Sequence, residues 1–108
     1  MPKRRAIPRR KKMTLTDHRR RIDELDRELV RLLNRRAQMS IQLGQLKRDV
    51  GLPARDEARE ESILRHIQRV NPGPLDGDAL CAIFRTVLKE SRRVTAELLA
   101  ETLSEVAK

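Results

Sequence analysis

The stretch that decides the fold covers residues 22–47 and reads IDELDRELVRLLNRRAQMSIQLGQLK. Its apolar residues recur at alternating steps of three and four, at positions 22, 25, 29, 32, 39, 43 and 46. This spacing places them along one stripe of a helix and fits a heptad seam, with Arg36 as the one exception. The stretch therefore predicts a long amphipathic helix.

The limits of this helix follow from its flanks. Upstream, Thr14-Leu-Thr-Asp17 offers the Ser/Thr-x-x-Asp/Glu pattern of a capping box, and no Pro or Gly interrupts the chain before Gly44. We expect a helix from about residue 16 to 49. At about 1.5 Å per residue it would span about 50 Å, whereas a compact domain of about 100 residues has a radius of gyration of about 13 Å. A second copy of the chain would cover its apolar stripe, so the sequence predicts a homodimer.

Two further helices are expected downstream. Gly51-Leu-Pro53 ends the first helix, and Asp56 is placed to N-cap a second one whose apolar residues fall on one side. Asn71-Pro-Gly-Pro74 ends the second helix, and a third pattern runs from about Asp76 almost to the C-terminus. Phe84 is the only aromatic residue, which also favours helices over strands. The predicted fold is all-α, with three helices in the order long, short, long.

The charge of the chain is unevenly distributed. Its formal charge is +9, and the Lys and Arg residues of the acid-free segment 1–12 account for seven of these charges. We expect residues 1–13 to form a basic, flexible arm and residues 14–108 to form one folded domain. No long apolar segment follows the arm, so neither a secretory signal nor a membrane span is predicted, and the cytoplasm is the expected location.

Several kinds of site lack a sequence signature. His18 and His66 are far apart and have no ligand at helical spacing, so no metal site is predicted and both are expected at the surface. No Gly-rich phosphate loop, nucleophile elbow or Cys-x-x-Cys occurs, so neither nucleotide binding nor covalent catalysis has a signature in the sequence. Cys81 lies among apolar residues and is interpreted as part of the core. Any activity should come from polar side chains on helix faces.

Two cations of the first helix are candidates for such a site. Arg36 stands at a seam position, where a guanidinium loses its water and needs an anion. Lys47 lies eleven residues on and projects from nearly the same stripe, so both would face one pocket. The alternative is that Arg36 pairs with an internal acid and that Lys47 only extends to solvent. Arg19 lies about a quarter turn off the stripe; in a dimer it could reach the partner's pocket, or it belongs to the solvated charge run of residues 18–21.

Polar residues on the two later helices complete the candidates. Asp56, Arg59 and Glu60 have the spacing i, i+3 and i+4 and share one helix face, where they could also pair with one another at the surface. Ser91 interrupts the apolar stripe of the third helix and Thr95 follows four residues later, although helical hydroxyls usually bond back to their own backbone. Spacing alone leaves both interpretations open.

Taken in order, these residues form a pattern that covers most of the chain. Its elements are Arg19-x-x-Ile22-x-x-Leu25-Asp26, Leu32-Leu33-x-x-Arg36, Gly44-x-x-Lys47, Pro53-x-x-Asp56-x-x-Arg59-Glu60, Asn71-x-Gly-Pro-Leu75, Ile83-Phe84 and Ser91. Each element is weak by itself, but the ordered set at these separations is specific. Over about residues 15–103 the chain resembles the AroQ-type chorismate mutases.

The resemblance implies an intertwined homodimer of three-helix chains with two equivalent active sites, each completed by an arginine from the partner's first helix. Arg19 would have that role. Arg36 and the partner's Arg19 would clamp the two carboxylates of chorismate, while Lys47 would approach a carboxylate and the ether oxygen of the breaking bond. The other substrate-binding positions would be Arg59, which adds positive charge, Glu60 and the Asp56 backbone at the ring hydroxyl, Ser91 at a carboxylate, and Thr95.

The implied reaction is the Claisen rearrangement of chorismate to prephenate in phenylalanine and tyrosine biosynthesis. It needs no metal, cofactor, nucleophile or proton transfer, only a held conformation and donors aimed at the ether oxygen. The catalytic residues would be Lys47, Arg36, Glu60 and Thr95, with Lys47 as the principal donor. Thr95 departs from the family pattern, which has Gln or Glu there, and its shorter side chain would need a bridging water.

Three alternatives are carried alongside this interpretation. An isochorismate-pyruvate lyase has the same fold and a similar cationic pocket. A non-enzymatic helical dimer could bind nucleic acid through residues 3–12, but this arm has no aromatic residues for stacking and a solubilising tail is favoured. The departure at Thr95 also fits a mutase that is activated by a partner enzyme of aromatic biosynthesis.

Overall fold

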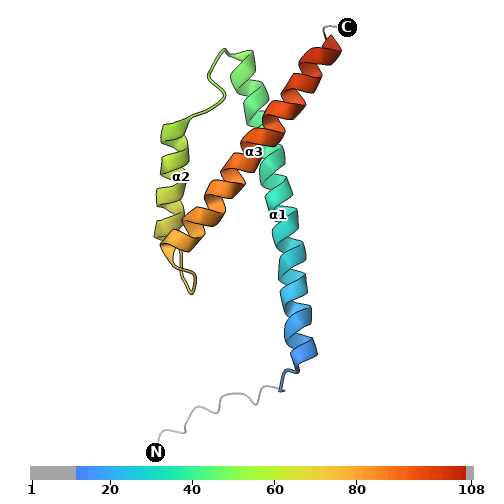
Figure 1. Cartoon of the computed structure of the whole chain (residues 1–108), viewed down its shortest axis with the longest axis vertical. Helices are drawn as coiled ribbons and strands as arrows, with labels where there is room; N and C mark the ends of the chain where they lie inside the picture. The colour runs from blue at the N-terminus through green and yellow to red at the C-terminus, as the bar shows by residue number, and fades with distance from the viewer. Residues whose placement is uncertain (1–11, 107–108) are drawn as a thin grey trace, which may run out of the picture. The chain divides into compact units, whose positions relative to one another are not determined.

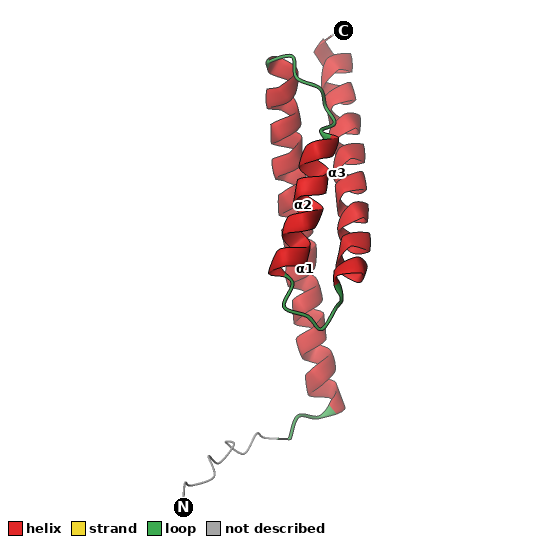
Figure 2. Ribbon diagram, turned by 90° about the vertical axis from the view of Figure 1, so that its left-hand side faces the viewer, coloured by secondary structure: helices red, strands yellow, loops and turns green. Residues whose placement is uncertain are grey.

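The computed structural model describes residues 12–106 of the chain and is all-helical in that range (Figure 1). It contains α1 (Leu15–Asp49), α2 (Glu57–Val70) and α3 (Gly77–Val106), joined by short loops (Figure 2). The predicted all-α order of long, short and long helices is confirmed. Most of the predicted basic arm, residues 1–11, lies outside the described residues.

The start of α1 carries the predicted capping box. The Asp17 amide donates to Thr14 Oγ1 at 3.1 Å, and the Thr14 amide donates to Asp17 Oδ2 at 3.0 Å. Hydrogen bonds from the Thr14 backbone and then its side chain favour the charged carboxylate and hold the pKa of Asp17 below its ordinary value. The helix therefore begins at the capping box formed by Thr14 and Asp17, as the sequence predicts.

The end of α1 is a glycine cap. The Leu52 amide donates to the Lys47 carbonyl oxygen at 2.8 Å, and the Gly51 amide donates to that of Arg48 at 3.2 Å, which together form a Schellman motif. Gly51 has a φ of +74°, a conformation that glycine adopts without the penalty of a Cβ atom. This turn redirects the chain toward α2.

The starts of α2 and α3 are each set by a carboxylate that caps the helix. Asp56 accepts from the Arg59 amide at 3.0 Å and N-caps α2, as the sequence predicts. Asp76 accepts from the Ala79 amide at 2.8 Å and caps α3 in the same way. Between the two helices, the Asn71 side chain is hydrogen bonded within the loop through both its nitrogen and its oxygen.

The chain divides into two units, Met1–Leu32 and Leu33–Lys108. In the second unit α3 packs along α2 (Figure 1), and Cys81 and Leu88 of α3 are only 3% and 6% exposed. The Cys81 thiol donates to the Leu64 carbonyl oxygen across this contact, with the sulfur 3.8 Å from the oxygen. Cys81 is thus a core residue, as predicted.

The apolar stripe of α1 is exposed in the single chain. The four residues of the stripe within Met1–Leu32 are between 52% and 64% exposed: Ile22, Leu25, Leu29 and Leu32. Fully burying a side chain of this kind stabilises a protein by about 1.5–3 kcal/mol. This stripe therefore has much to gain from contact with a second apolar surface.

Two further observations concern the surface. His18 and His66 are both exposed, as the sequence predicts. None of the described helices combines the length and the apolar composition that crossing a membrane would require.

Candidate active site

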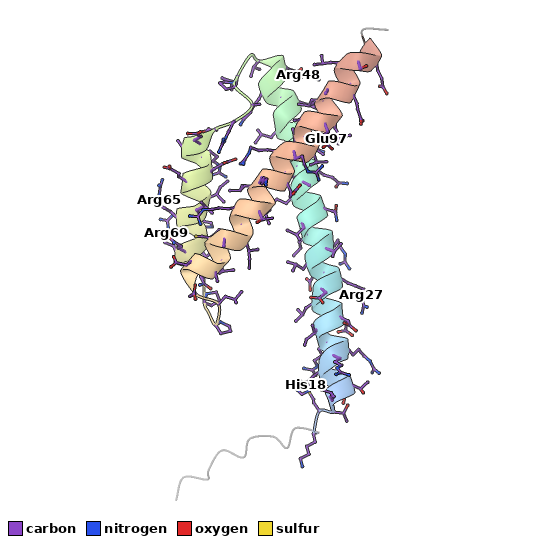
Figure 3. The ribbon with its side chains drawn as sticks, in the orientation of Figure 1. His18, Arg27, Arg48, Arg65, Arg69 and Glu97 are labelled. Atoms are coloured by element: carbon purple, nitrogen blue, oxygen red, sulfur yellow. The ribbon has the colours of Figure 1, made fainter. Side chains whose placement is uncertain are left out.

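A cavity of about 340 Å³ lies within the unit Leu33–Lys108, a volume typical of small-molecule sites. All three helices and the loop before α2 contribute to it. Seven of the eight site residues expected from the sequence line it: Arg36, Lys47, Asp56, Arg59, Glu60, Ser91 and Thr95. Arg65 and Arg69 do not line it, and they lie on the side of α2 that faces away from α3 (Figure 3).

Positive charge dominates the cavity lining. Among the described residues the cationic side chains are Arg36, Lys47, Arg55, Arg59 and Arg92, and the carboxylates are Asp56 and Glu60. Leucine and isoleucine side chains from the same three helices lie between them and lower the local dielectric constant. The cavity therefore suits a small ligand that carries more than one negative charge.

Arg36 and Lys47 of α1 both line this cavity. Arg36 is half-buried, and no carboxylate within residues 12–106 lies at ion-pair distance from it. Within residues 12–106, the alternative of an internal acid as its partner is therefore wrong. The side chain of Lys47 is half-buried, and its ammonium donates a long hydrogen bond of 3.5 Å to the exposed Ala54 carbonyl oxygen in the loop before α2. Arg36 keeps its donors available for an anion.

The carboxylates of α2 have different partners from those that spacing suggests. The Asp56 carboxylate is occupied by the Arg59 amide at the N-terminus of the helix. The Glu60 carboxylate accepts a hydrogen bond from Arg92 of α3, and its other oxygen lies 3.8 Å from Arg55. No ion pair joins Asp56, Arg59 and Glu60 in the described chain, so the alternative in which they form mutual ion pairs is wrong.

Ser91 and Thr95 lie where α3 meets α1. Ser91 is buried, and Thr95 Oγ1 donates to the Ser91 carbonyl oxygen at 2.7 Å, the bond that helical threonines commonly make. The Thr95 methyl group faces Gly44, because a Cβ atom at Gly44 would lie only 2.6 Å from Thr95 Cγ2. Gly44 therefore permits the close approach of the two helices, and the Thr95 proton is already engaged.

Arg19 is the eighth residue of the expected set, and it belongs to a different unit of the chain from the cavity. It is exposed on α1 in the unit Met1–Leu32 and is not among the lining residues. Its contribution to a partner's site stays a prediction.

Arg55 and Arg92 are lining residues that the sequence reasoning missed. Arg92 is 32 residues from Glu60 in the chain, so no local spacing connects the two. Arg55 falls beside Asp56 in the predicted loop, and this adjacency to a predicted site residue was the one available signal.

Comparison with known proteins now identifies the family. Residues 18–96 match the family chorismate mutase type II, a range that contains Arg19 and the seven predicted residues of the cavity. The chain belongs to this family. The resemblance to the AroQ-type chorismate mutases that the motifs indicate is therefore confirmed.

The relatives of this chorismate mutase type II chain include bifunctional proteins and proteins named as chorismate mutases alone. The bifunctional chorismate mutase/prephenate dehydratase of Neisseria gonorrhoeae is 43% identical over 84 residues, which cover 78% of this chain and 23% of that protein. The chorismate mutase of Methanocaldococcus jannaschii is 25% identical over 89 residues, with 82% and 90% covered. The structure of chorismate mutase (form II) from Thermus thermophilus aligns with a TM-score of 0.73 at 31% identity, with 75% and 92% covered. The chain spans about a fifth of the length of the bifunctional relatives and most of the length of the other two.

Proposed function

We propose that this chain rearranges chorismate to prephenate in phenylalanine and tyrosine biosynthesis. One observation carries the proposal: among the described residues, the polar side chains that the family resemblance assigns to the substrate line one cavity in which cations outnumber carboxylates. Chorismate carries two carboxylates, so a cavity of this charge and size suits it. Membership of the chorismate mutase type II family supports the same reaction.

The carboxylates of the substrate are the anchors in this proposal. Arg36 binds one of them, since its half-buried guanidinium is free of acidic partners in the described chain and can form a bidentate pair. The partner subunit's Arg19 binds the other. Arg59 adds positive charge to the site. Ser91 of α3 helps to bind a substrate carboxylate. Clamping both ends holds the compact, pseudo-diaxial conformer and lowers the entropic part of the barrier.

The chemical step breaks the ether C–O bond while a C–C bond forms, and negative charge develops on the ether oxygen. A cation aimed at this oxygen stabilises the transition state more than the ground state. Lys47 is the residue we assign to it, because it lines the cavity and its ammonium lies beside the Ala54 carbonyl oxygen of the same lining. Glu60 accepts a hydrogen bond from the ring hydroxyl, and the Asp56 backbone helps to hold the same group. This contact fixes the ring but takes no part in bond exchange.

Thr95 lies where the family pattern has Gln or Glu. Its hydroxyl proton is used by the Ser91 carbonyl oxygen. We therefore infer that a bridging water, and not Thr95 itself, supplies the second hydrogen bond to the ether oxygen. Such a site is less well preorganised than one with a direct donor. This agrees with the proposal that a partner enzyme of aromatic biosynthesis activates the mutase.

We further propose that two copies of the chain form an intertwined dimer through their first helices. The exposed apolar stripe of α1 supports this arrangement, because a second stripe would remove it from water. The same dimer would deliver Arg19 to the partner's cavity. Residues 14–108 are proposed as the folded domain of a cytoplasmic enzyme, and the basic residues 1–13 as a solubilising segment.

The first test is chorismate consumption by the purified chain, with identification of the product. Wild type is compared with Arg36→Ala and Lys47→Ala, and with Arg65→Ala as an exposed arginine outside the cavity. We expect prephenate, a loss of about 100-fold or more in kcat/KM for both cavity variants, and wild-type activity for the control. Pyruvate released from isochorismate would instead indicate the lyase, and inactivity toward both substrates, alone and with a partner synthase, would overturn the enzyme proposal.

The shared site has its own test by complementation. Arg19→Ala and Arg36→Ala chains are each expected to be nearly inactive, but unfolding and refolding them together forms mixed dimers in which one of the two sites has both arginines. Because about half of the dimers are mixed, about a quarter of wild-type activity should return. No recovery, with mixed dimers present, would show that Arg19 does not act in the partner's site.

A further inference from the structure

We infer that Arg92 is a positioning residue that orients the Glu60 carboxylate for the substrate's ring hydroxyl and offsets its charge toward the substrate's carboxylates. The inference rests on the proposed function, in which Glu60 accepts that hydroxyl. Arg92 lies directly after Ser91 on α3 and lines the cavity, although no motif in the sequence singles it out.

The contact between Arg92 and Glu60 is a partly buried ion pair between two helices. A guanidinium nitrogen of Arg92 donates to Glu60 Oε2, and the two side chains are only 35% and 19% exposed. Charged hydrogen bonds of this kind are short, directional and stronger than pairs at an open surface. The pair therefore fixes the Glu60 side chain in one rotamer against α3.

The geometry leaves one oxygen of Glu60 for the substrate. Arg92 engages Oε2, whereas the nearest Arg55 nitrogen is 3.8 Å from Oε1, which is longer than a hydrogen bond. A carboxylate oxygen has lone pairs for further donors. With Oε2 held, rotation of the carboxylate is restricted, and Oε1 keeps the capacity to accept from the ring hydroxyl.

Charge gives the second reason for this pairing. Glu60 is an anion in the lining of a cavity that we assign to a dianionic substrate, and an uncompensated carboxylate there would repel it. Arg92 offsets that charge through its hydrogen bond to Oε2, and Arg55 adds a longer contact to Oε1. Arg36, Lys47 and Arg59 form no ion pair with Glu60 in the described chain and can act on the substrate.

Arg93 offers a matched control one residue away. Its guanidinium pairs along the exposed face of α3 with Glu90 at 2.5 Å and with Glu97 at 2.9 Å, and it does not line the cavity. Both arginines can be replaced by methionine, which keeps a long apolar side chain and removes the charge. Comparing the Arg92 and Arg93 variants distinguishes the effect of losing the ion pair with Glu60 from the effect of losing an ion pair elsewhere on α3.

The experiment measures kcat and KM for chorismate in the full chain, for wild type, Arg92→Met, Arg92→Lys and Arg93→Met. The hydrogen bond between Glu60 and the ring hydroxyl is equally strong in the ground and transition states. Weakening this hydrogen bond should therefore raise KM and leave kcat nearly unchanged. We expect Arg92→Met to raise KM about tenfold with kcat changed by less than about twofold. Arg92→Lys should recover part of this loss because it restores the charge without the planar fork, and Arg93→Met should match wild type.

A second pair of variants tests whether Arg92 acts through Glu60. In a Glu60→Gln background, adding Arg92→Met should leave KM unchanged, because the carboxylate that Arg92 orients is gone. A further rise in KM would overturn the positioning role and make Arg92 a direct ligand of the substrate. Equal effects of Arg92→Met and Arg93→Met would overturn the inference alone, whereas an inactive wild type would overturn the proposed function and this role with it.

Discussion

Replacing Gly44 by alanine is expected to destabilise the protein even though alanine is the better helix former. Gly44 lies inside α1, where exchange of glycine for alanine normally stabilises by about 1 kcal/mol. Here the added Cβ atom would lie 2.6 Å from Thr95 Cγ2 and 3.4 Å from Leu99 Cδ1. The first of these contacts is too short, so α1, α3 or the threonine must move.

The magnitude follows from how little Thr95 can yield. Its side chain is short and branched at Cβ, and its hydroxyl is bonded to the Ser91 carbonyl oxygen at 2.7 Å, so rotation about χ1 breaks a hydrogen bond. Overpacking of this kind costs about 1–3 kcal/mol. Set against the gain in helix propensity, Gly44→Ala should lower the free energy of unfolding by about 1 kcal/mol.

Thr95→Ser provides the matching relief, because it removes Cγ2 and keeps the hydroxyl. Alone it should cost about 1 kcal/mol for the lost methyl group. In the double variant the alanine methyl occupies the vacated space, so stability should return close to that of wild type, a coupling free energy of about 2 kcal/mol. Urea unfolding followed by circular dichroism measures the cycle, at one protein concentration because association shifts apparent stability. Additive effects of the two substitutions, within about 0.5 kcal/mol, would refute this account of the α1–α3 contact.

Three further predictions concern single positions. Thr95→Gln should raise kcat by about tenfold by placing an amide donor near the ether oxygen, and an unchanged or lower rate would show that the site does not use this position. The depressed pKa of Asp17 means that its capping contribution is fully present above the ordinary value of 3.8 and is lost as the pH falls through the lowered value. Hydrogen exchange in the first turn of α1 should therefore be faster in Asp17→Asn than in wild type at pH 7, and the two should converge in acid. Gly51→Ala should lower the free energy of unfolding by about 1 kcal/mol because the φ of residue 51 is +74°, and no atom lies within 4 Å of the added Cβ to cause a clash. Gly77→Ala should lower it by less in the same unfolding assay, because its Cβ would meet Gln68 at an ordinary distance of 3.4 Å.

The helices were predictable because their signals are local. Thr14 and Asp17 contact each other across one turn, Gly51 ends α1 through its own backbone conformation, and Asp56 caps the helix that follows it. Each of these interactions joins residues at most a few positions apart, so spacing in the sequence contains the geometry. Tertiary structure adds little to where the helices begin and end.

The lining of the cavity was predictable only in part. Arg36 and Lys47 share a helical stripe, and spacing alone places them on one side of α1. The partner of Glu60 could not be read in this way, since Arg92 belongs to another helix and their contact depends on how α2 and α3 align. The same holds for Thr95 and Gly44, whose close approach requires a specific crossing of α3 and α1.

Position 95 combines packing and chemistry, and a final prediction separates them. The Thr95 methyl group fills the space at Gly44 while its hydroxyl bonds within its own helix, so the residue serves the α1–α3 contact more directly than it serves the cavity. Glutamine has no branch at Cβ and should give up that contact, at a cost of about 0.5–1.5 kcal/mol. In the double variant Gly44→Ala/Thr95→Gln, the alanine methyl refills the space and regains helix propensity. This variant should therefore keep the higher kcat of Thr95→Gln and unfold at the urea concentration of wild type. A double variant as unstable as Thr95→Gln alone would mean that the methyl group at residue 95 is not what fills the space at Gly44.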